Sequence, residues 1–475
     1  MGKVLPKNLK KYAHEIILAI LTISYLSYFT YATFLRYENF YAGKFDLGNM
    51  VQTVWNSAHG NIFMLTDPNA TREVSRLAFH SDFILVLFAP FYLIWEDPRT
   101  LLLIQTIVLS FGGLFVYLIS NHVLKNKNIS LVFALSYFLS PAVHFTNLFD
   151  FHSVTLATTF FLCAFYFMFK KNWRSMLIFL ILAAITKEQI WLITGLVGIY
   201  LFFAHKKKML GTFITLSSFF IFYLLIWHLM PQNLGKQHFA IPYYSSFGDS
   251  PLEIAANIFL EPQKTIKTLL MPDRILFIKQ LFIPLGYLSF FAPLFLIFAG
   301  PDLVINLLSA SNPLHQIYYQ YSAAITPFIF ISAIFGIKFL KSKIPQISYN
   351  AFGAMIIIFS IISAYDYGPL PYSRHPSLKT YKRALPEKME IYSYISLLTP
   401  DEKIAATNNI GAQLSQRRHV YVIPRGLDIA DKAIFLTSRS MNSGEKAAFE
   451  KIKSDPDFIP IFKSGGFYVF KRINR

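Results

Sequence analysis

Long apolar runs separated by short polar segments recur along most of the chain. About 20 apolar residues at ~1.5 Å rise per residue cross the ~30 Å hydrocarbon core of a bilayer, so these runs predict membrane-spanning helices. The stretch from Phe83 to Trp95 is too short, because about 13 residues reach only ~20 Å, and is expected to be interfacial or re-entrant. About eleven spans are predicted, near residues 15–35, 99–120, 130–148, 153–169, 173–188, 189–204, 209–230, 276–299, 302–318, 322–340 and 348–364.

The segment GKFDLGNMVQTVWNSAHG, residues 43–60, follows the first span and has a different pattern. Its residues divide into an apolar set, Leu47, Met50, Val51, Val54, Trp55 and Ala58, and a polar set, Asn49, Gln52, Thr53 and Asn56. This spacing predicts an amphipathic helix lying in the membrane interface. Asp46 stands at the expected N-cap and Gly60 just past the end, so helix capping is the structural alternative to a chemical role for Asp46.

Residues 366–475 have the mixed pattern of a small α/β domain. Helices are predicted near 386–398 and 443–453, strands near 403–407, 419–423 and 432–437, and a final hairpin in FIPIFKSGGFYVFKR, where Ser464, Gly465 and Gly466 form the turn. The expected fold class is therefore mainly α: a polytopic transmembrane helix bundle over residues 1–365, with a first external loop at 36–98, and a C-terminal external α/β domain.

Composition supports a membrane protein, since 54% of the residues are hydrophobic and 15% are charged. The net charge of +18 does not indicate a nucleic-acid partner, because Lys and Arg fall in short clusters between apolar runs. Cys163 is the only cysteine, which excludes an internal disulfide. No phosphate-binding glycine loop or dinucleotide fingerprint is present.

The basic clusters predict the orientation, because cytoplasmic loops collect Lys and Arg. If the chain crosses the membrane at the spans above and not at residues 81–97, all the Lys and Arg clusters that contain no Asp or Glu lie on the same side of the membrane. They comprise Lys3, Lys7, Lys10 and Lys11, then Lys125 and Lys127, then Lys170, Lys171 and Arg174, then Lys206, Lys207 and Lys208, and finally Lys338, Lys341 and Lys343. The prediction is a multi-pass cell-membrane protein with a cytoplasmic N-terminus and an extracytoplasmic C-terminal domain.

Other ionisable residues gather at the predicted external ends of the spans. They are His80 and Asp82 in FHSDF, Asp150 and His152 in LFDFHS, Lys187 and Glu188 in TKEQ, and His315 in NPLHQIYYQY. A charged group near bilayer depth costs about 2.5–3.5 kcal/mol, so such residues indicate a functional site by default.

Each group also has a structural alternative. Lys187 and Glu188 fit a polar turn between two short helices, and His315 with its neighbouring tyrosines fits an interfacial aromatic belt. The four residues of the first two motifs have the ligand types of a divalent metal site, although each triplet alone is a weak signal; the set is His80, Asp82, Asp150 and His152. A divalent metal is the one candidate cofactor.

Several segments together resemble a known family, the prokaryotic predicted membrane proteins of domain of unknown function 2079 (DUF2079). They are FDLGNMVQTVW, FHSDFILVLFAPFYLIWEDPRTLLLIQ, LSPAVHFTNLFDFHSVTLA, ITKEQ, HQIYYQYSAAITPF and the C-terminal PDEKIAATNNIGAQLSQRRHVYVIP. The resemblance extends from about residue 40 to the end.

More distantly, the layout resembles the C-type membrane glycosyltransferases (GT-C), including the protein mannosyltransferase and aminoarabinose transferase relatives. This resemblance implies sugar transfer from a polyprenyl-phosphate carrier on the outer face, with a catalytic Asp in the first external loop. Asp46 stands at that place, and Asp150 matches an acidic position of the second external loop. The paired acidic signature of some members is absent, because Phe45 and Leu47 flank Asp46.

The resulting hypothesis is an inverting glycosyltransferase that acts on a glycan, lipid or protein acceptor. Asp46 would accept the proton of the acceptor hydroxyl, and the donor-phosphate site would comprise Lys187, His315, Asp150 and Glu188. The positive charge beside the leaving phosphate would come from Lys187 or His315, or from a metal held by His80, Asp82, Asp150 and His152. The alternatives are a transporter or lipid flippase, or a non-catalytic membrane protein. A transporter is expected to have midplane polar residues or repeated broken helices, whereas here the charges gather at one end and no inverted repeat is apparent.

Overall fold

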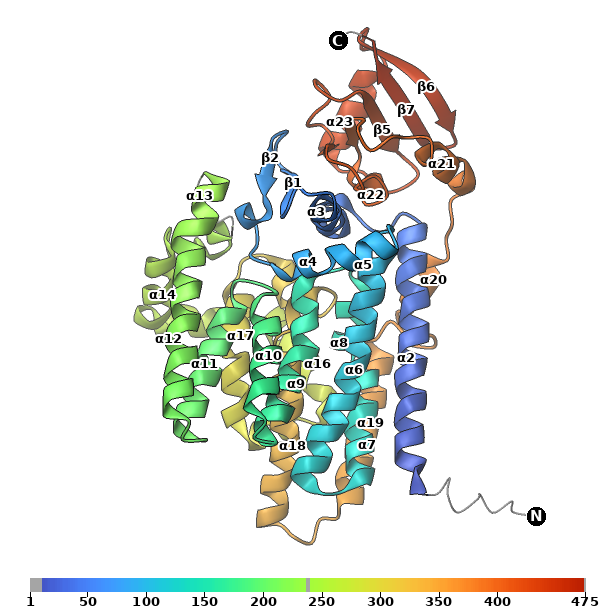
Figure 1. The fold of residues 1–475 in the computed structure, drawn as a ribbon. Coiled ribbons are helices and arrows are strands. Elements are labelled where there is room, and N and C mark those ends of the chain that lie inside the picture. Colours follow the sequence, from blue (N-terminus) through green and yellow to red (C-terminus); the bar gives the residue numbers. More distant parts are fainter. Residues whose placement is uncertain (1–10, 236–239, 474–475) are drawn as a thin grey trace, which may run out of the picture.

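The computed structural model describes residues 11–235 and 240–473. Most of the chain forms a bundle of helices, and a small sheet lies at one end of it (Figure 1). The bundle contains α2 (Ala13–Glu38), α6 (Arg99–Leu124), α7 (Lys127–Leu139), α8 (Pro141–Leu148), α9 (Ala157–Phe169), α10 (Trp173–Ala184), α11 (Ile190–Phe203), α12 (Lys208–Leu224), α16 (Pro272–Phe282), α17 (Gly300–Leu308), α18 (Thr326–Lys343) and α19 (Tyr349–Tyr367). Aromatic side chains such as Phe133, Phe161 and Phe328 fill its core. The predicted helical membrane fold is confirmed.

Four helices of the described ranges are long and apolar enough to cross a membrane: α2, α6, Lys208–Leu234 and α19. A fifth span results if α7 and α8, which meet at 44°, form one broken helix. Pro141 begins α8 and has no N–H group to continue the hydrogen bonding of α7, which explains the break. The other apolar helices are shorter, so the count of about eleven spans stays a prediction.

Two predicted spans are wrong as continuous helices. In the span predicted at 276–299, α16 ends at Phe282 and short 3₁₀ segments follow. In the span predicted at 302–318, α17 ends at Leu308. Prolines remove backbone donors in both regions, and Gly286 has a left-handed φ of +56°. The apolar content was detected correctly, but these residues prevent one regular helix.

The segment from Phe83 to Trp95 does not form a crossing helix, as predicted. It forms two short helices, α4 (Ile84–Leu87) and α5 (Ala89–Ile94), at the end of the bundle that faces the sheet (Figure 1). The remaining short elements of this end are a hairpin of β1 (Met64–Thr66) and β2 (Glu73–Ser75), and the helices α13 (Met230–Leu234), α14 (Pro251–Leu260), α15 (Pro262–Leu269) and α20 (Ser377–Tyr381). None of these was predicted from the sequence.

The amphipathic helix is present as α3 (Asn49–Ala58), and Gly60 follows it with a φ of +87°. Two parts of its prediction are wrong. Asp46 is no N-cap, because it lies inside a π-helical turn, Lys44–Gly48, that leads into α3. The polar face does not meet water either: Gln52 is fully buried and donates to the carbonyl oxygens of Arg417 and Arg418. The C-terminal region therefore covers this helix.

The predicted C-terminal elements are confirmed. Strands β3 (Ile404–Ala406), β4 (Val420–Val422), β5 (Lys432–Leu436), β6 (Phe458–Ser464) and β7 (Phe467–Arg472) form one sheet in the order β4-β3-β5-β7-β6, accompanied by α21 (Lys388–Ile395) and α23 (Ser443–Ile452). The hairpin β6–β7 turns at Gly465, whose φ is +51°. A short helix, α22 (Asn408–Gly411), was not predicted and contacts the turn that carries Asp46.

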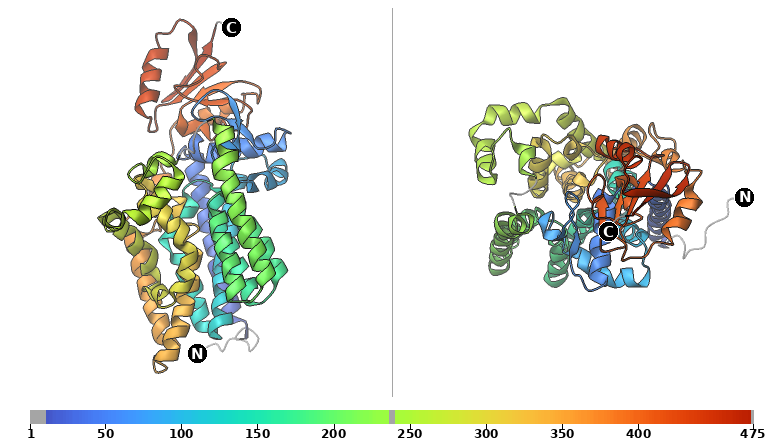
Figure 2. Two further views of the ribbon diagram at one scale, coloured as in Figure 1. Left: turned by 90° about the vertical axis from the view of Figure 1, so that its left-hand side faces the viewer. Right: turned by 90° about the horizontal axis from the view of Figure 1, so that it is seen from above.

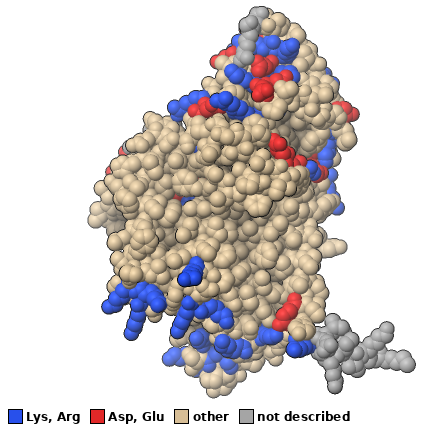
Figure 3. Space-filling view, in the orientation of Figure 1, with Lys and Arg blue, Asp and Glu red and all other residues tan. Residues whose placement is uncertain are grey.

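Lys and Arg gather at the end of the bundle opposite the sheet (Figure 3). The basic clusters lie in the turns α6–α7, α9–α10 and α11–α12 and at the end of α18. In the side view, the sheet and the start of α2 lie at opposite ends of the molecule (Figure 2). Lys3, Lys7 and Lys10 are outside the described residues. This separation of charge supports the predicted orientation, which itself stays a prediction.

Two exposed serines provide a matched test of orientation, Ser342 at the basic end and Ser440 beside the sheet. In intact cells, Ser440→Cys should react with a membrane-impermeant maleimide, whereas Ser342→Cys should react only after permeabilisation. Cys163 is buried and should give little background. The reverse labelling pattern would overturn the orientation and the external site.

Candidate active site

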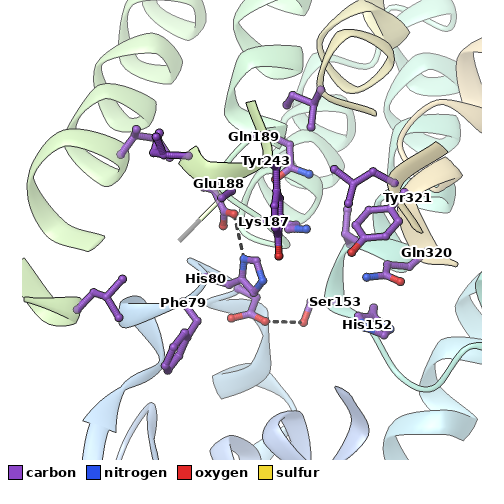
Figure 4. A pocket seen from close by; sticks show the side chains of 18 of the residues that line it. Phe79, His80, His152, Ser153, Lys187, Glu188, Gln189, Tyr243, Gln320 and Tyr321 are labelled. Carbon is purple, nitrogen blue, oxygen red and sulfur yellow. Dashed lines mark hydrogen bonds and ion pairs between the residues drawn. The ribbon is translucent and has the colours of Figure 1, made fainter. Parts of the chain in front are cut away.

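A cavity of about 790 Å³ lies among the first external loop, the segment after α8, the turn between α10 and α11, and helices α12, α14 and α17. Side chains from several of these elements turn toward one space (Figure 4). Of the residues predicted for the site, the cavity brings together Asp46, His80, Asp82, His152, Lys187 and Glu188. Asp150 and His315 do not line it.

Asp46 is the accessible acid of this cavity. Its side chain is 38% exposed, against 6% for Glu188 and 3% for Asp82. His152 Nε2 lies 3.3 Å from Asp46 Oδ1, while the other ring nitrogen of His152 lies 3.1 Å from the carbonyl oxygen of Phe149. The imidazole is thus fixed at both nitrogens and orients the Asp46 carboxylate.

The electrostatic surroundings keep Asp46 ionised. Burial alone would raise the pKa of Asp46, but the hydrogen bond and charge of His152 and the charges of Arg36 and Arg76 lower it below the usual value for aspartate. Asp46 is therefore a carboxylate at neutral pH, which can accept a proton.

The other acids of this region are held by fixed partners. Arg76 Nη2 lies 2.9 Å from Asp82 Oδ2, and both side chains are buried. Glu188 accepts from the Ser81 N–H and contacts His80 Nδ1 at 3.0 Å. The Arg76–Asp82 pair links two parts of the loop 36–98, and the contacts of Glu188 link this loop to the α10–α11 turn.

Asp150 lies outside the cavity wall. It pairs with Arg36 of α2 at 3.0 Å and accepts from the Gly43 N–H at 3.3 Å. Its backbone has a left-handed φ of +51°. Asp150 therefore supports the loop that carries Asp46 and does not contact the cavity.

The predicted metal ligands do not form a metal centre. Within residues 11–235 and 240–473, no three His, Cys, Asp or Glu side chains form a group that could hold a metal ion. Arginines already neutralise the two acids, Asp82 and Asp150, and each histidine contacts another carboxylate. The four predicted ligands are thus held by other partners and do not converge on one point among the described residues. No step proposed below uses a metal.

The two predicted cations of the phosphate site have different surroundings. Lys187 lines the cavity with its Nζ 5.8 Å from the ring centroid of Tyr321. Its charge acts on Asp302, which also lines the cavity, but the ion pairs of the described residues do not include Lys187. His315 is buried and pairs with Asp273 at 2.9 Å. Lys187 is therefore available to an anionic ligand, whereas His315 belongs to a separate pair.

Sequence reasoning missed several lining residues, among them Arg76, Tyr243 and Asp302. Asp302 is buried and stands at the start of an apolar run. Lys187 was identified because it is a charged residue at the end of such a run, so the same signal could have identified Asp302. Arg76 lies in a polar loop and Tyr243 in a segment without a predicted element, so neither had a distinguishing local pattern.

One wall of the cavity is apolar. Phe222 and Ile226 of the α12 region and Ile254 and Ile258 of α14 line it. The opposite side of α14 has large apolar residues that are 75–82% exposed: Leu252, Phe259 and Leu260. In a membrane-spanning chain such residues contact lipid. Helix α14 therefore has an apolar face toward the cavity and a second apolar face toward the outside of the structure.

A family model and one solved structure agree with this architecture. A family model described as a predicted membrane protein, DUF2079, matches residues 36–454. The chain is similar to the structure of ArnT from Cupriavidus metallidurans bound to undecaprenyl phosphate, with 10% identity, coverage of 97% of this chain and 98% of that chain, and a TM-score of 0.53. The Archaeoglobus fulgidus oligosaccharyltransferase, tethered with an acceptor peptide, gives 12% identity, coverage of 89% and 65%, and a TM-score of 0.41. A comparison with curated proteins gives no match.

The buried Arg76–Asp82 pair generates a stability prediction. Asp82→Ala leaves the Arg76 guanidinium buried without its counter-charge, which should lower the free energy of unfolding by about 3–5 kcal/mol. Thermal unfolding of the purified protein in detergent measures this loss. Asp401→Ala, at an exposed position of the C-terminal region, is the control and should unfold like the wild type. Wild-type stability of Asp82→Ala would show that the pair does not hold the first loop.

Proposed function

The chain belongs to the DUF2079 family of predicted membrane proteins, and we propose that it is a membrane glycosyltransferase that takes its sugar from a polyprenyl-phosphate carrier. The observation that carries the proposal is the accessible, ionised Asp46 carboxylate. It lies in a cavity that also contains Lys187, which forms no ion pair with a described carboxylate, and an apolar wall. The ArnT-like fold supports the same class of reaction.

The polarity of the cavity fits an amphiphilic donor. A polyprenyl chain would lie against Ile254 and Ile258 of α14, a helix that has exposed apolar side chains on its other side. Its phosphate would then lie near Lys187, whose ammonium group would stabilise the anion. The ArnT structure was determined with undecaprenyl phosphate, a lipid of this chemistry.

The proposed reaction needs one base and one anion-binding group. Asp46 removes the proton of an acceptor hydroxyl while that oxygen attacks the anomeric carbon of the sugar. The bond between the anomeric carbon and the phosphate oxygen breaks with inversion, and polyprenyl phosphate leaves with both electrons of that bond. Lys187 stabilises the charge that develops on the phosphate, and His152 keeps the Asp46 carboxylate oriented.

The reaction would occur on the extracytoplasmic face, because the cavity and the basic clusters lie at opposite ends of the bundle. A glycan, a lipid or a protein that offers a hydroxyl group is a suitable acceptor.

Asp46→Asn tests the base directly. The amide keeps the size of the side chain and an oxygen for His152, but it cannot accept the proton, so the rate should fall by about 10²- to 10⁴-fold while thermal stability is unchanged. The measurement is release of polyprenyl phosphate from a panel of synthetic polyprenyl-phosphate-linked sugars by the purified protein. Asp401→Asn is the matched control and should retain the wild-type rate.

Two results would contradict the proposal. An Asp46→Asn protein as active as the wild type would remove Asp46 as the base. Transport of the intact donor across vesicles by the wild-type protein, without release of polyprenyl phosphate, would favour a flippase instead.

A further inference from the structure

The turn that carries Asp46 is held by two parts of the chain that are far apart in sequence. The Gly43 N–H donates to Asp150 Oδ2 at 3.3 Å, and the Phe45 N–H donates to Asn408 Oδ1 at 3.0 Å. Asp150 belongs to the helix bundle, whereas Asn408 begins α22 of the C-terminal region. The residue directly before Asp46 is therefore fixed by a side chain of the C-terminal region.

The approach of the two segments is very close. A Cβ atom at Gly411 would lie 2.4 Å from Lys44 Cβ, and one at Gly48 would lie 2.7 Å from Ser415 Oγ. Both distances are below ordinary van der Waals contact, so these positions require glycine. Ala412 packs into the same cluster as Leu47. The contact between α22 and the turn is thus a packed interface.

A second set of hydrogen bonds links the same parts. Lys44 is 1% exposed, and its Nζ donates to Asn49 Oδ1 at 2.8 Å and Gln52 Oε1 at 3.0 Å. Gln52 in turn donates to the carbonyl oxygens of Arg417 and Arg418. The start of the turn is therefore connected to the C-terminal region in two ways, through the exposed Phe45–Asn408 hydrogen bond and through the buried contacts of Lys44 with Gln52.

Asn408 is itself rigidly placed. Its backbone N–H donates to Glu445 Oε1 at 2.6 Å, and Glu445 forms a capping box with Asn442 at the start of α23. The side chain that holds Phe45 is thus anchored to a regular helix of the C-terminal α/β fold.

We propose that Asn408 is a positioning residue for Asp46, so that the C-terminal region forms part of the transferase site although it does not line the cavity. The proposal rests on the function proposed above. A reacting group displaced by about 1 Å can lose ~10²-fold in rate. The Asn408 contact matters because it fixes the backbone immediately before the base.

Three variants separate positioning from general stability. Asn408→Ala removes the acceptor of the Phe45 N–H, and Asn408→Asp retains an oxygen at the same place. Asn409→Ala is the matched control, because the Asn409 amide donates only within the C-terminal region, to the carbonyl oxygens of Leu436 and Ser440. Each full-length protein is compared by its kcat and KM for release of polyprenyl phosphate, and by hydrogen exchange of the peptide covering residues 43–48.

Asn408→Ala should lower kcat by about 10- to 100-fold with little change in KM, and should accelerate exchange of this peptide at least about tenfold. Asn408→Asp should restore most of both properties, and Asn409→Ala should leave both near wild type. Unchanged kcat and exchange in Asn408→Ala would overturn the proposal, as would an equal loss in Asn409→Ala. If the wild type releases no polyprenyl phosphate from any donor of the panel, the proposed function fails, while the exchange data still decide whether Asn408 holds the turn.

Discussion

The need to neutralise buried charge organises the end of the helix bundle that faces the C-terminal sheet. An isolated charge away from water is strongly unfavourable, so a buried carboxylate requires a counter-charge or several hydrogen-bond donors. Asp82 has Arg76, Asp150 has Arg36, and Glu188 has the Ser81 N–H and His80. These partnerships fix the first external loop against the bundle.

The same constraint distinguishes the residues that are free to react. A carboxylate held in a buried ion pair with arginine is not accessible to an acceptor hydroxyl, because the guanidinium covers its oxygens. Asp46 is the more exposed carboxylate and contacts only a histidine among these partners. Lys187 faces the cavity near Tyr321, and its charge acts on the buried Asp302, but it forms no ion pair within the described residues. The chemistry of the site therefore follows from which charges were left accessible.

Local patterns in the sequence predicted much of the fold. The long spans and the C-terminal hairpin were predicted correctly because their signals, apolar length and a Gly-Gly turn between alternating strands, are contained in short segments. The span at 276–299 failed where prolines interrupt a run of high apolar content. The burial of the polar face of α3 was not predicted, because the residues that accept hydrogen bonds from it, Arg417 and Arg418, lie more than 300 positions away in sequence.

The site was predicted only in part, because local sequence patterns identify polar residues but do not identify their long-range partners. Asp46, His152 and Lys187 were identified as polar residues at the ends of apolar segments, and the cavity brings them together. The four candidate metal ligands are not gathered into one group among the described residues, and the sequence does not specify that Arg76 and Arg36 pair with two of them. Asp273, the partner of His315, lies in a segment for which no local role was predicted. The surroundings of the metal candidates and of His315 therefore depend on partners distant in sequence, which the residue types alone do not indicate.

The position of the donor in a complex is the most direct test of this account. A structure of the protein with a non-hydrolysable polyprenyl-phosphate sugar should place the phosphate beside Lys187, the anomeric carbon on the side of Asp46, and the lipid chain along α14. A head group bound at the basic end of the bundle, or beside His315 and Asp273, would contradict it.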